Sequence, residues 1–479
     1  MRKTIVAIAA HAAALIGLIA WFGWGRSDAP PDIAAPPPEE IETQAPAPDS
    51  KFTGEPERNA TLRVLENDTA IRQGYFALLL EAFNAEYAEY GITAVDASMD
   101  QYLDLENDGP YGYGPDVLYQ ANDMIMKHVE GQHIQPLPAE TLGCFGQVDE
   151  RAWQAYRDAG GVCYGVPVNI QAPVLYYRRD LLPDDWEAEW DRDHNGIPDI
   201  IEYWADLYRF SLLRRGEGGY GYMKALYDVY FASGFLFSYG GYVFGNNGND
   251  ASDVGFAGGS AEQGAFIIKQ LAGLMNEDCI DTTINNTQYS KIASGEYFCT
   301  ITTPDVYTMF VRELELAGVP VENLVVTSVP RLPASGDLTD TGGGSIPCVM
   351  MGGVNGYAVS SYTKYPNAAL AFVDFATGYE MVMKRHEMLG IVPARADAAR
   401  ETGGLSLVVY ETLAAGNLAL MPSIRQVAQI WTPMETLFSD IAKDAFRPAA
   451  QQKYVTPEDF KQALIKANRQ VYDAIWTLN

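Results

Sequence analysis

A strand, a helix and a second strand follow one another within residues 62–95, and this order limits the fold more than any other feature of the chain. The apolar segment 62–65 predicts a strand, and residues 75–83 predict an amphipathic helix after a polar turn. Further strands are expected at 92–95 and 115–119. Parallel strands joined by helices form α/β sheets, which bind ligands at the carboxyl ends of their strands. The sequence therefore predicts an α/β protein.

Length and charge limit the partners of this protein. The 479 residues can form two or three hydrophobic cores, and 48% hydrophobic with 20% charged residues is an ordinary globular composition. The formal net charge of -29 repels phosphate backbones and anionic membrane surfaces. Nucleic acid is therefore excluded as a partner, whereas neutral and cationic small ligands remain open.

The N-terminus predicts export of the chain. Arg2 and Lys3 precede an apolar run at residues 4–24, and the Pro-rich segment 28–55 cannot form a core. Residues 1–27 are interpreted as an N-terminal membrane anchor, with a cleaved signal peptide as the alternative. Residues 28–55 then form a tether, and the globular part lies outside the cytoplasm, in the periplasm or at the cell surface.

The segment 191–202 matches the twelve-residue calcium loop of an EF-hand at each side-chain position which that pattern specifies. Gly196 stands where the loop must turn sharply. The alternative is an acidic, solvated turn before a helix. The oxygen ligands expected for one structural calcium ion come from Asp191, Asp193, Asn195, Asp199 and Glu202, and from the backbone carbonyl of Ile197.

Five cysteines in an exported chain suggest disulfides. The pairs closest in sequence are Cys144 with Cys163 and Cys279 with Cys299, which leaves Cys348 over. The alternative is that all five are small buried hydrophobic residues, since sequence does not fix connectivity. Neither a Cys-x-x-Cys pair nor a zinc-ligand spacing occurs.

Six phrases, spread over residues 60 to 475, resemble in order the family 1 extracytoplasmic solute-binding proteins of ABC transporters, which include the maltodextrin binders. The phrases are Gly114-Pro-Asp-Val-Leu-Tyr-Gln-Ala-Asn-Asp, Tyr164-Gly-Val-Pro-Val-Asn through Leu175-Tyr-Tyr-Arg-Arg-Asp-Leu-Leu-Pro, Tyr239-Gly-Gly-Tyr-Val-Phe, Ser294-Gly-Glu-Tyr-Phe-Cys-Thr-Ile, Gly353-Val-Asn-Gly-Tyr-Ala-Val-Ser, and Met421-Pro-Ser-Ile with Trp431.

The resemblance implies a two-lobed periplasmic-binding-protein fold of type II, with a hinge between two α/β lobes that close on a ligand. It places lobe one at residues 56–168 plus 334–388, and lobe two at 172–329 plus 394–479. Hinge closure around a ligand is an established mode of conformational change. The protein is expected to be a monomer that delivers its ligand to an ABC permease.

The resemblance also implies ligand-binding residues. Asp123, Asp228, Tyr230 and Trp431 match acidic and aromatic cleft positions of the maltodextrin binders. Each has a structural alternative, in which the aromatic residues pack in the core and the polar residues cap a helix or turn.

The chain also departs from the maltodextrin binders. Gln120 and Asp305 replace tryptophans, Met124 replaces an arginine and Gln171 replaces a glutamate, while Asp68 is a further candidate whose alignment can shift by one residue. These changes put maltose itself in doubt and favour another mono- or oligosaccharide, or a polyol.

The expected function is sugar binding for import, without catalysis. An exported glycoside hydrolase is the first alternative, because carboxylates and aromatic rings in a cleft also serve that reaction. An anchored sugar sensor or adhesion module is the second. The calcium loop follows Leu181-Leu-Pro, where the family has a short turn, so we expect the ion to fasten an inserted loop away from the cleft.

Overall fold

A computed structural model describes residues 52, 54–101, 103, 105–275, 279 and 284–477. The predicted anchor at 1–27 and most of the tether at 28–55 lie outside these residues. Among the residues that the structure does describe, none of the helices combines the length and the apolar character needed to span a membrane.

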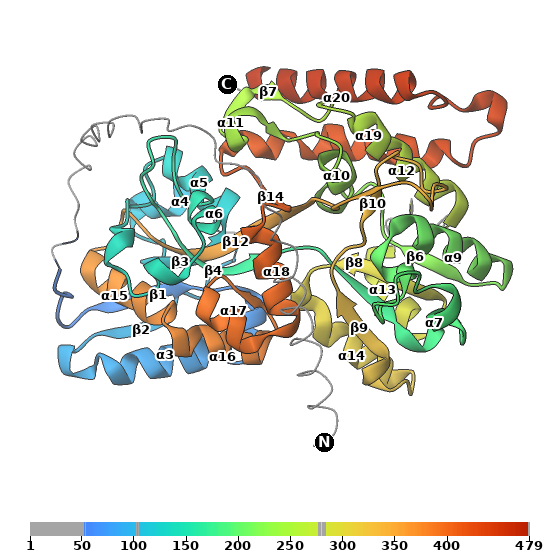
Figure 1. Ribbon diagram of the computed structural model, residues 1–479. Helices are drawn as coiled ribbons and strands as arrows, with labels where there is room; N and C mark the ends of the chain where they lie inside the picture. The colour runs from blue at the N-terminus through green and yellow to red at the C-terminus, as the bar shows by residue number, and fades with distance from the viewer. Residues whose placement is uncertain are drawn as a thin grey trace, which may run out of the picture. The chain divides into compact units, whose positions relative to one another are not determined.

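The first lobe is built on a seven-stranded sheet with the order β13-β4-β12-β3-β1-β2, in which β14 also pairs with β12 (Figure 1). Strand β1 is parallel to β2 and β3, as the sequence predicts, but β12 runs antiparallel to β3 and β4. The sheet is therefore mixed. Its strands are β1 Thr61–Leu65, β2 Thr93–Asp96, β3 Val117–Ala121, β4 Val166–Gln171, β12 Met350–Val359, β13 Val392–Pro393 and β14 Leu418–Leu420.

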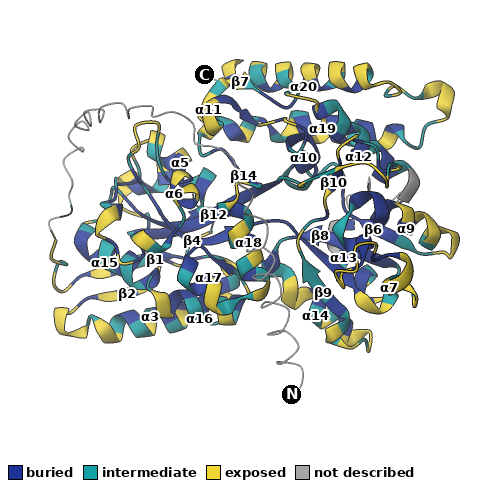
Figure 2. Cartoon of the chain, in the orientation of Figure 1, coloured by how far each residue is buried: buried dark blue, intermediate teal, exposed yellow. Residues whose placement is uncertain are grey.

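Helices cover this sheet because their apolar sides pack on it. Helix α3 buries Tyr75, Phe76, Leu79 and Phe83, and Figure 2 shows exposed residues along its outer side. The helices of this lobe are α2 Asp68–Arg72, α3 Tyr75–Glu86, α4 Leu105–Asp108, α5 Asn122–Glu130, α6 Glu150–Gln154, α15 Pro366–Ala376, α16 Tyr379–Leu389, α17 Ala396–Thr402 and α18 Gly404–Ala414.

A buried ion pair lies in the core of the first lobe. The Arg385 guanidinium donates to both carboxylate oxygens of Glu66, at 2.8 and 2.9 Å, and Tyr357 donates its hydroxyl to the same carboxylate at 2.6 Å. Both charged side chains are fully buried. The pair joins the end of β1 to α16.

The second lobe contains a four-stranded sheet with the order β6-β8-β5-β9. Its strands are β5 Val174–Arg178, β6 Tyr220–Met223, β8 Tyr297–Thr302 and β9 Leu324–Thr327. The other elements are α7 Trp186–Glu189, α8 Asp199–Glu202, α9 Trp204–Gly216, α10 Val229–Phe237, α11 Gly245–Gly248, β7 Asp250–Val254, α12 Ala261–Met275, α13 Ile284–Ala293, α14 Tyr307–Leu316, β10 Leu332–Pro333, β11 Ser345–Ile346, α19 Trp431–Asp444 and α20 Pro457–Thr477.

The predicted first crossing between the lobes lies close to its position in the structure, whereas the other two are shifted. Strand β4 of the first sheet leads through residues 172–173 into β5 of the second. The segment after β9 stays with the second lobe, where Gln270 of α12 donates to Asp337, so lobe one resumes near residue 350 and not at 334.

The predicted start of the last lobe-two segment at residue 394 is also wrong. Strand β13 pairs with β4, and α17 and α18 pack beside it on the first lobe. The chain returns to the second lobe only after β14, where α19 and α20 pack on α12. These contacts join residues far apart in sequence, which explains why local patterns placed the boundary too early.

Candidate functional site

Tyr230 lies where the two lobes meet. It belongs to the first turn of α10, where the Asp228 carboxylate accepts a hydrogen bond from the Tyr230 backbone N–H at 3.2 Å and so caps the helix. The Tyr230 hydroxyl donates to the carbonyl oxygen of Gln171 at 3.2 Å. Gln171 is the last residue of β4, so this bond ties the second lobe to the first crossing segment.

The charges of three predicted carboxylates act on the hydroxyl of this tyrosine. Burial raises the pKa of Tyr230 above its usual value, and the charges of Asp305, Asp228 and Asp123 raise it further. Asp123 lies in the first turn of α5 in lobe one. Asp305 lies in lobe two, in the single 3-10 turn η7 Pro304–Val306 that follows β8. Acidic residues from both lobes therefore act electrostatically on the same tyrosine.

Burial also affects the carboxylates themselves. Burial raises the pKa of Asp123, whereas hydrogen bonds from the backbone N–H groups of Met124 and Asp123 act to lower it. Burial raises the pKa of Asp228 as well, against the positive charge of Lys224 and the N–H groups of Tyr230 and Phe231. The burial of these two carboxylates is thus only partly offset by the groups around them.

Sequence reasoning missed Lys224. This side chain is only 4% exposed, and its ammonium lies 3.5 Å from the centre of the Phe231 ring. Burial lowers the pKa of Lys224 to about 8, although the charge of Asp228 acts in the opposite direction. A single lysine within the run Tyr222-Met-Lys-Ala-Leu is a signal that could have revealed it, because buried lysines are rare.

The remaining predicted ligand residues have other contacts. Gln120 is 5% exposed and donates to the Gln101 carbonyl at 2.8 Å, while the Asp68 backbone N–H donates to the Gln101 side chain at 3.1 Å. Both residues thus meet Gln101. Trp431 is half-buried at the start of α19 and packs against the core.

The predicted calcium loop folds around its first carboxylate. The two Asp191 oxygens accept the backbone N–H groups of Asn195 and Gly196, each at 3.0 Å. The Asn195 amide donates to both Glu202 oxygens at 3.1 and 3.2 Å. Gly196 has φ 80°, the left-handed conformation that favours glycine.

The other predicted calcium ligands of this loop are not gathered around one site. Arg192 holds Asp199 through its side chain at 3.1 Å. Burial raises the pKa of Glu202, as do the charges of Asp193, Asp199 and Asp191, while the Asn195 amide lowers it. In the described part of the chain, no three acidic, histidine or cysteine side chains are placed together as metal ligands. The loop has the residues for calcium, with the carboxylates spread around its backbone.

Comparison with known proteins decides the family. The family model for bacterial extracellular solute-binding proteins matches residues 68–383, more than half of the chain. The chain belongs to this family. The maltodextrin-binding protein MdxE of Bacillus subtilis (strain 168) is 26% identical over 392 residues, which cover 78% of this chain and 85% of that protein.

Two further relatives agree with this assignment. A maltooligosaccharide ABC transporter solute-binding lipoprotein of Streptococcus pneumoniae (strain ATCC BAA-255 / R6) is 24% identical over 425 residues, which cover 86% of this chain and 93% of that one. The crystal structure of the maltose-binding periplasmic protein MalE from Listeria monocytogenes, in complex with maltose, superimposes with a TM-score of 0.69 at 22% identity, covering 88% of this chain and 99% of that one. The two-lobed fold is thereby confirmed.

In this solute-binding protein the predicted calcium loop is joined to the segment that follows β9 in lobe two. The helix after the loop is interrupted at Tyr203, whose extended backbone forms a bridge with Arg331. The Arg331 N–H donates to the Glu202 carbonyl at 2.7 Å, and the Trp204 N–H donates to the Arg331 carbonyl at 2.9 Å. Two helices, α8 and α9, therefore follow the loop.

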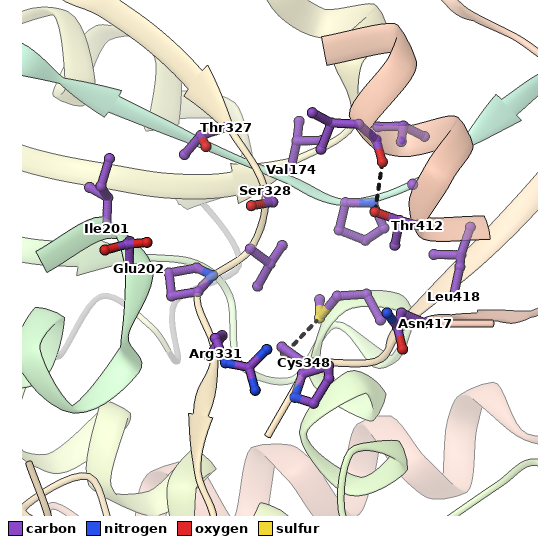
Figure 3. A pocket seen from close by; sticks show the side chains of 18 of the residues that line it. Val174, Ile201, Glu202, Thr327, Ser328, Arg331, Cys348, Thr412, Asn417 and Leu418 are labelled. Atoms are coloured by element: carbon purple, nitrogen blue, oxygen red, sulfur yellow. Dashed lines mark hydrogen bonds between the residues drawn. The ribbon is translucent and has the colours of Figure 1, made fainter. Parts of the chain in front are cut away.

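A cavity of about 310 Å³ lies beside the first crossing at residues 172–173 and the segment that follows β9 (Figure 3). Helix α8 of lobe two contributes Ile201 and Glu202, and α18 of lobe one contributes Val409 and Thr412. Among the described residues that line this cavity, Tyr230, Asp123, Asp228 and Asp305 do not occur. The loop thus lies next to the hinge, and Glu202 faces a space between the lobes.

The structure forms neither of the predicted disulfides, Cys144 with Cys163 or Cys279 with Cys299. Burial raises the pKa of Cys163 to about 11, and its thiol donates to the Gly165 carbonyl at 3.2 Å. Burial likewise raises the pKa of Cys144, Cys299 and Cys348. Four of the five cysteines are buried and Cys348 is half-buried, which agrees with the alternative that the sequence left open, in which cysteines serve as small hydrophobic residues.

Proposed function

We propose that this protein is the extracytoplasmic receptor of an ABC importer and binds a mono- or oligosaccharide between its lobes. The observation that carries the proposal is the junction of the lobes at Tyr230, whose hydroxyl donates to the Gln171 carbonyl at 3.2 Å and on which the charges of Asp123, Asp228 and Asp305 act. Carboxylates accept hydrogen bonds from sugar hydroxyls, and an aromatic residue supplies an apolar face. Relatives named for maltodextrin and maltooligosaccharide binding support a sugar as the ligand.

A thermal-shift screen of the full-length protein over sugars, polyols and amino acids tests this function. A ligand that binds only the folded protein raises its melting temperature. At a ligand concentration of one hundred times the Kd, the free energy of unfolding increases by about 2.7 kcal/mol. We expect at least one sugar to do so, and calorimetric titration to give one site per chain. Stabilisation by amino acids alone would contradict the proposal. Steady release of shorter sugars from an oligosaccharide would instead support the glycoside hydrolase considered above.

The location follows from the family, whose members are extracellular, and the mode of attachment is part of the proposal. We expect residues 4–24 to remain as an anchor and residues 28–55 to act as a tether that holds a monomeric receptor near its permease. Recovery of the intact N-terminus in alkali-washed membranes would support the anchor. A mature chain that starts after residue 25 would contradict it.

The same proposal assigns one structural calcium ion to the loop Asp191–Glu202. Support comes from the sequence pattern and from the carboxylates whose charges raise the pKa of Glu202, since a cation would relieve that repulsion. Asp191, Asp193, Asn195, Asp199 and Glu202, with the Ile197 carbonyl, would hold the ion. Calcium supplies a positive charge that fixes the loop.

Chelation tests the calcium site. We expect a chelator to lower the melting temperature, calcium to restore it, and Asp191→Asn to abolish the response. Asp184→Asn, which changes an exposed carboxylate outside the loop, serves as the matched control. An unchanged melting temperature on calcium addition to the metal-stripped protein would refute the structural role.

A further inference from the structure

The loop Asp191–Glu202 lies at the junction of the two lobes. Two of its residues, Ile197 and Glu202, line the cavity of about 310 Å³, and Val409 and Thr412 of α18 line it from lobe one. Figure 3 shows Glu202 on one side of this cavity and Thr412 on the other. Ile197 is 44% exposed, so an apolar side chain of this acidic loop borders the space between the lobes. A shift of the loop therefore changes that space.

The same cavity is lined by two segments that cross between the lobes. Ala172 and Pro173 form the first crossing, between β4 and β5. Pro347 and Cys348 lie between β11 of lobe two and β12 of lobe one. In hinge motions, a few residues at the ends of strands and helices absorb the change in backbone angles. Rotation of one lobe against the other therefore reshapes this cavity and the surroundings of Glu202.

A short backbone path joins the loop to the first crossing. Thr327, the last residue of β9, pairs with Leu175 of β5, the strand that follows the crossing. Further along, the Arg331 N–H donates to the Glu202 carbonyl at 2.7 Å, and the Arg331 carbonyl accepts the Trp204 N–H at 2.9 Å. The path from Thr327 to Arg331 lines the cavity throughout. The backbone at the end of the loop is thus fixed to a strand that leads from the hinge.

Glu202 links the calcium site of the proposed function to this path. Its carboxylate stands at position 12 of the loop pattern, which supplies two oxygens to the ion. Both oxygens accept the Asn195 amide at 3.1 and 3.2 Å, and this neutral donor leaves their charge in place. The backbone carbonyl of the same residue accepts the Arg331 N–H. An ion that fixes the Glu202 side chain therefore also restrains the bridge to Arg331.

We infer that calcium in the loop and sugar in the cleft strengthen each other's binding through the hinge. This inference rests on the proposed function, which assigns both ligands. Closure on a sugar fixes the crossing segments, and calcium fixes the path that pairs with them. When one ligand orders a segment that the other must also order, the second binds with a smaller loss of conformational entropy. Such coupling is reciprocal and typically amounts to about 5- to 150-fold in affinity.

Hydrogen exchange of the full-length protein, with calcium as the only added ligand, tests the link between loop and hinge. Calcium should slow exchange at the Arg331 and Trp204 amides, whose N–H groups form the bridge, and in the crossing segments 172–175 and 347–350. Magnesium at the same concentration controls for ionic strength. Slowing that is confined to residues 191–202 would contradict the inference, because calcium would then fasten the loop without reaching the hinge.

Calorimetric titration measures the coupling itself. The probe is the sugar that gives the largest thermal shift in the screen above, titrated into calcium-loaded and into metal-stripped protein. We expect sugar to bind at least about fivefold more tightly with calcium, and calcium to gain the same factor from that sugar.

The outcomes separate this inference from the proposed function. Equal sugar affinities with and without calcium would overturn the inference and leave both proposed sites intact. A protein that binds no calcium would overturn the inference together with the proposed calcium site. A protein that binds calcium but none of the sugars would overturn the proposed receptor.

Two variants of one residue locate the path. Arg331→Pro removes the N–H that Glu202 accepts, whereas Arg331→Ala keeps it and removes only the side chain, which donates to Ser345 at 2.9 and 3.0 Å. We expect the coupling to fall below about twofold in Arg331→Pro and to persist in Arg331→Ala. Unchanged coupling in Arg331→Pro would exclude the bridge as the path. If Arg331→Pro does not fold, the exchange and titration results on the native protein decide the inference.

Discussion

Lys224 offers a test of the cleft that needs no ligand. Its pKa falls from 10.5 to about 8 on folding. A pKa difference of one unit corresponds to about 1.4 kcal/mol, so the buried ammonium destabilises the fold by about 3 kcal/mol near neutral pH. Between these two pKa values the unfolded chain binds a proton that the folded chain lacks. Stability attributable to Lys224 therefore rises with pH across this window.

The variant Lys224→Met removes this dependence. We expect the free energy of unfolding of the native protein, relative to the variant, to rise by about 2 kcal/mol between pH 8 and pH 10. Urea unfolding followed by tryptophan fluorescence at several pH values measures it, with Lys461→Met, at an exposed lysine, as the matched control. A difference between native protein and Lys224→Met that stays constant over this range would refute the buried, uncompensated ammonium.

Two further predictions concern the core of lobe one and the second lobe. Arg385→Met or Glu66→Gln should each destabilise the protein by about 3–5 kcal/mol, because either change leaves a buried group without its partner. The double variant should lose clearly less stability than the two single variants combined. Additive losses in a double-mutant cycle would contradict the pairing. Trp431→Ala should weaken sugar binding about fivefold, while Trp476→Ala, at an exposed tryptophan, should not; equal effects in calorimetric titration would exclude stacking on Trp431.

Local patterns predicted the elements that local chemistry determines. Strands β1, β2 and β3 lie where the sequence placed them, and Gly196 turns the Asp191 loop as the calcium pattern requires. The family resemblance supplied Asp123, Asp228, Asp305 and Tyr230 as candidates, and the charges of the three carboxylates act on Tyr230 in the structure.

Features that depend on contacts distant in sequence were missed. The assignment of α17 and α18 to lobe one follows from their packing beside β13, and no local signal reports it. The unusual environment of Lys224 arises from helix α10. Phe231 lies in this helix, and Asp228 caps its start. Spacing of cysteines likewise does not determine whether two thiols form a disulfide, and the structure forms neither predicted pair.

The central claim is that a sugar binds between the two lobes and draws them together. Small-angle X-ray scattering of the protein, with and without the sugar that the thermal-shift screen identifies, tests it most directly. We predict a smaller radius of gyration at saturating sugar, and no such change for a variant that carries Asp123→Asn and Asp228→Asn and no longer binds. A sugar that occupies one site per chain and leaves the radius of gyration unchanged would contradict closure of the lobes on the ligand.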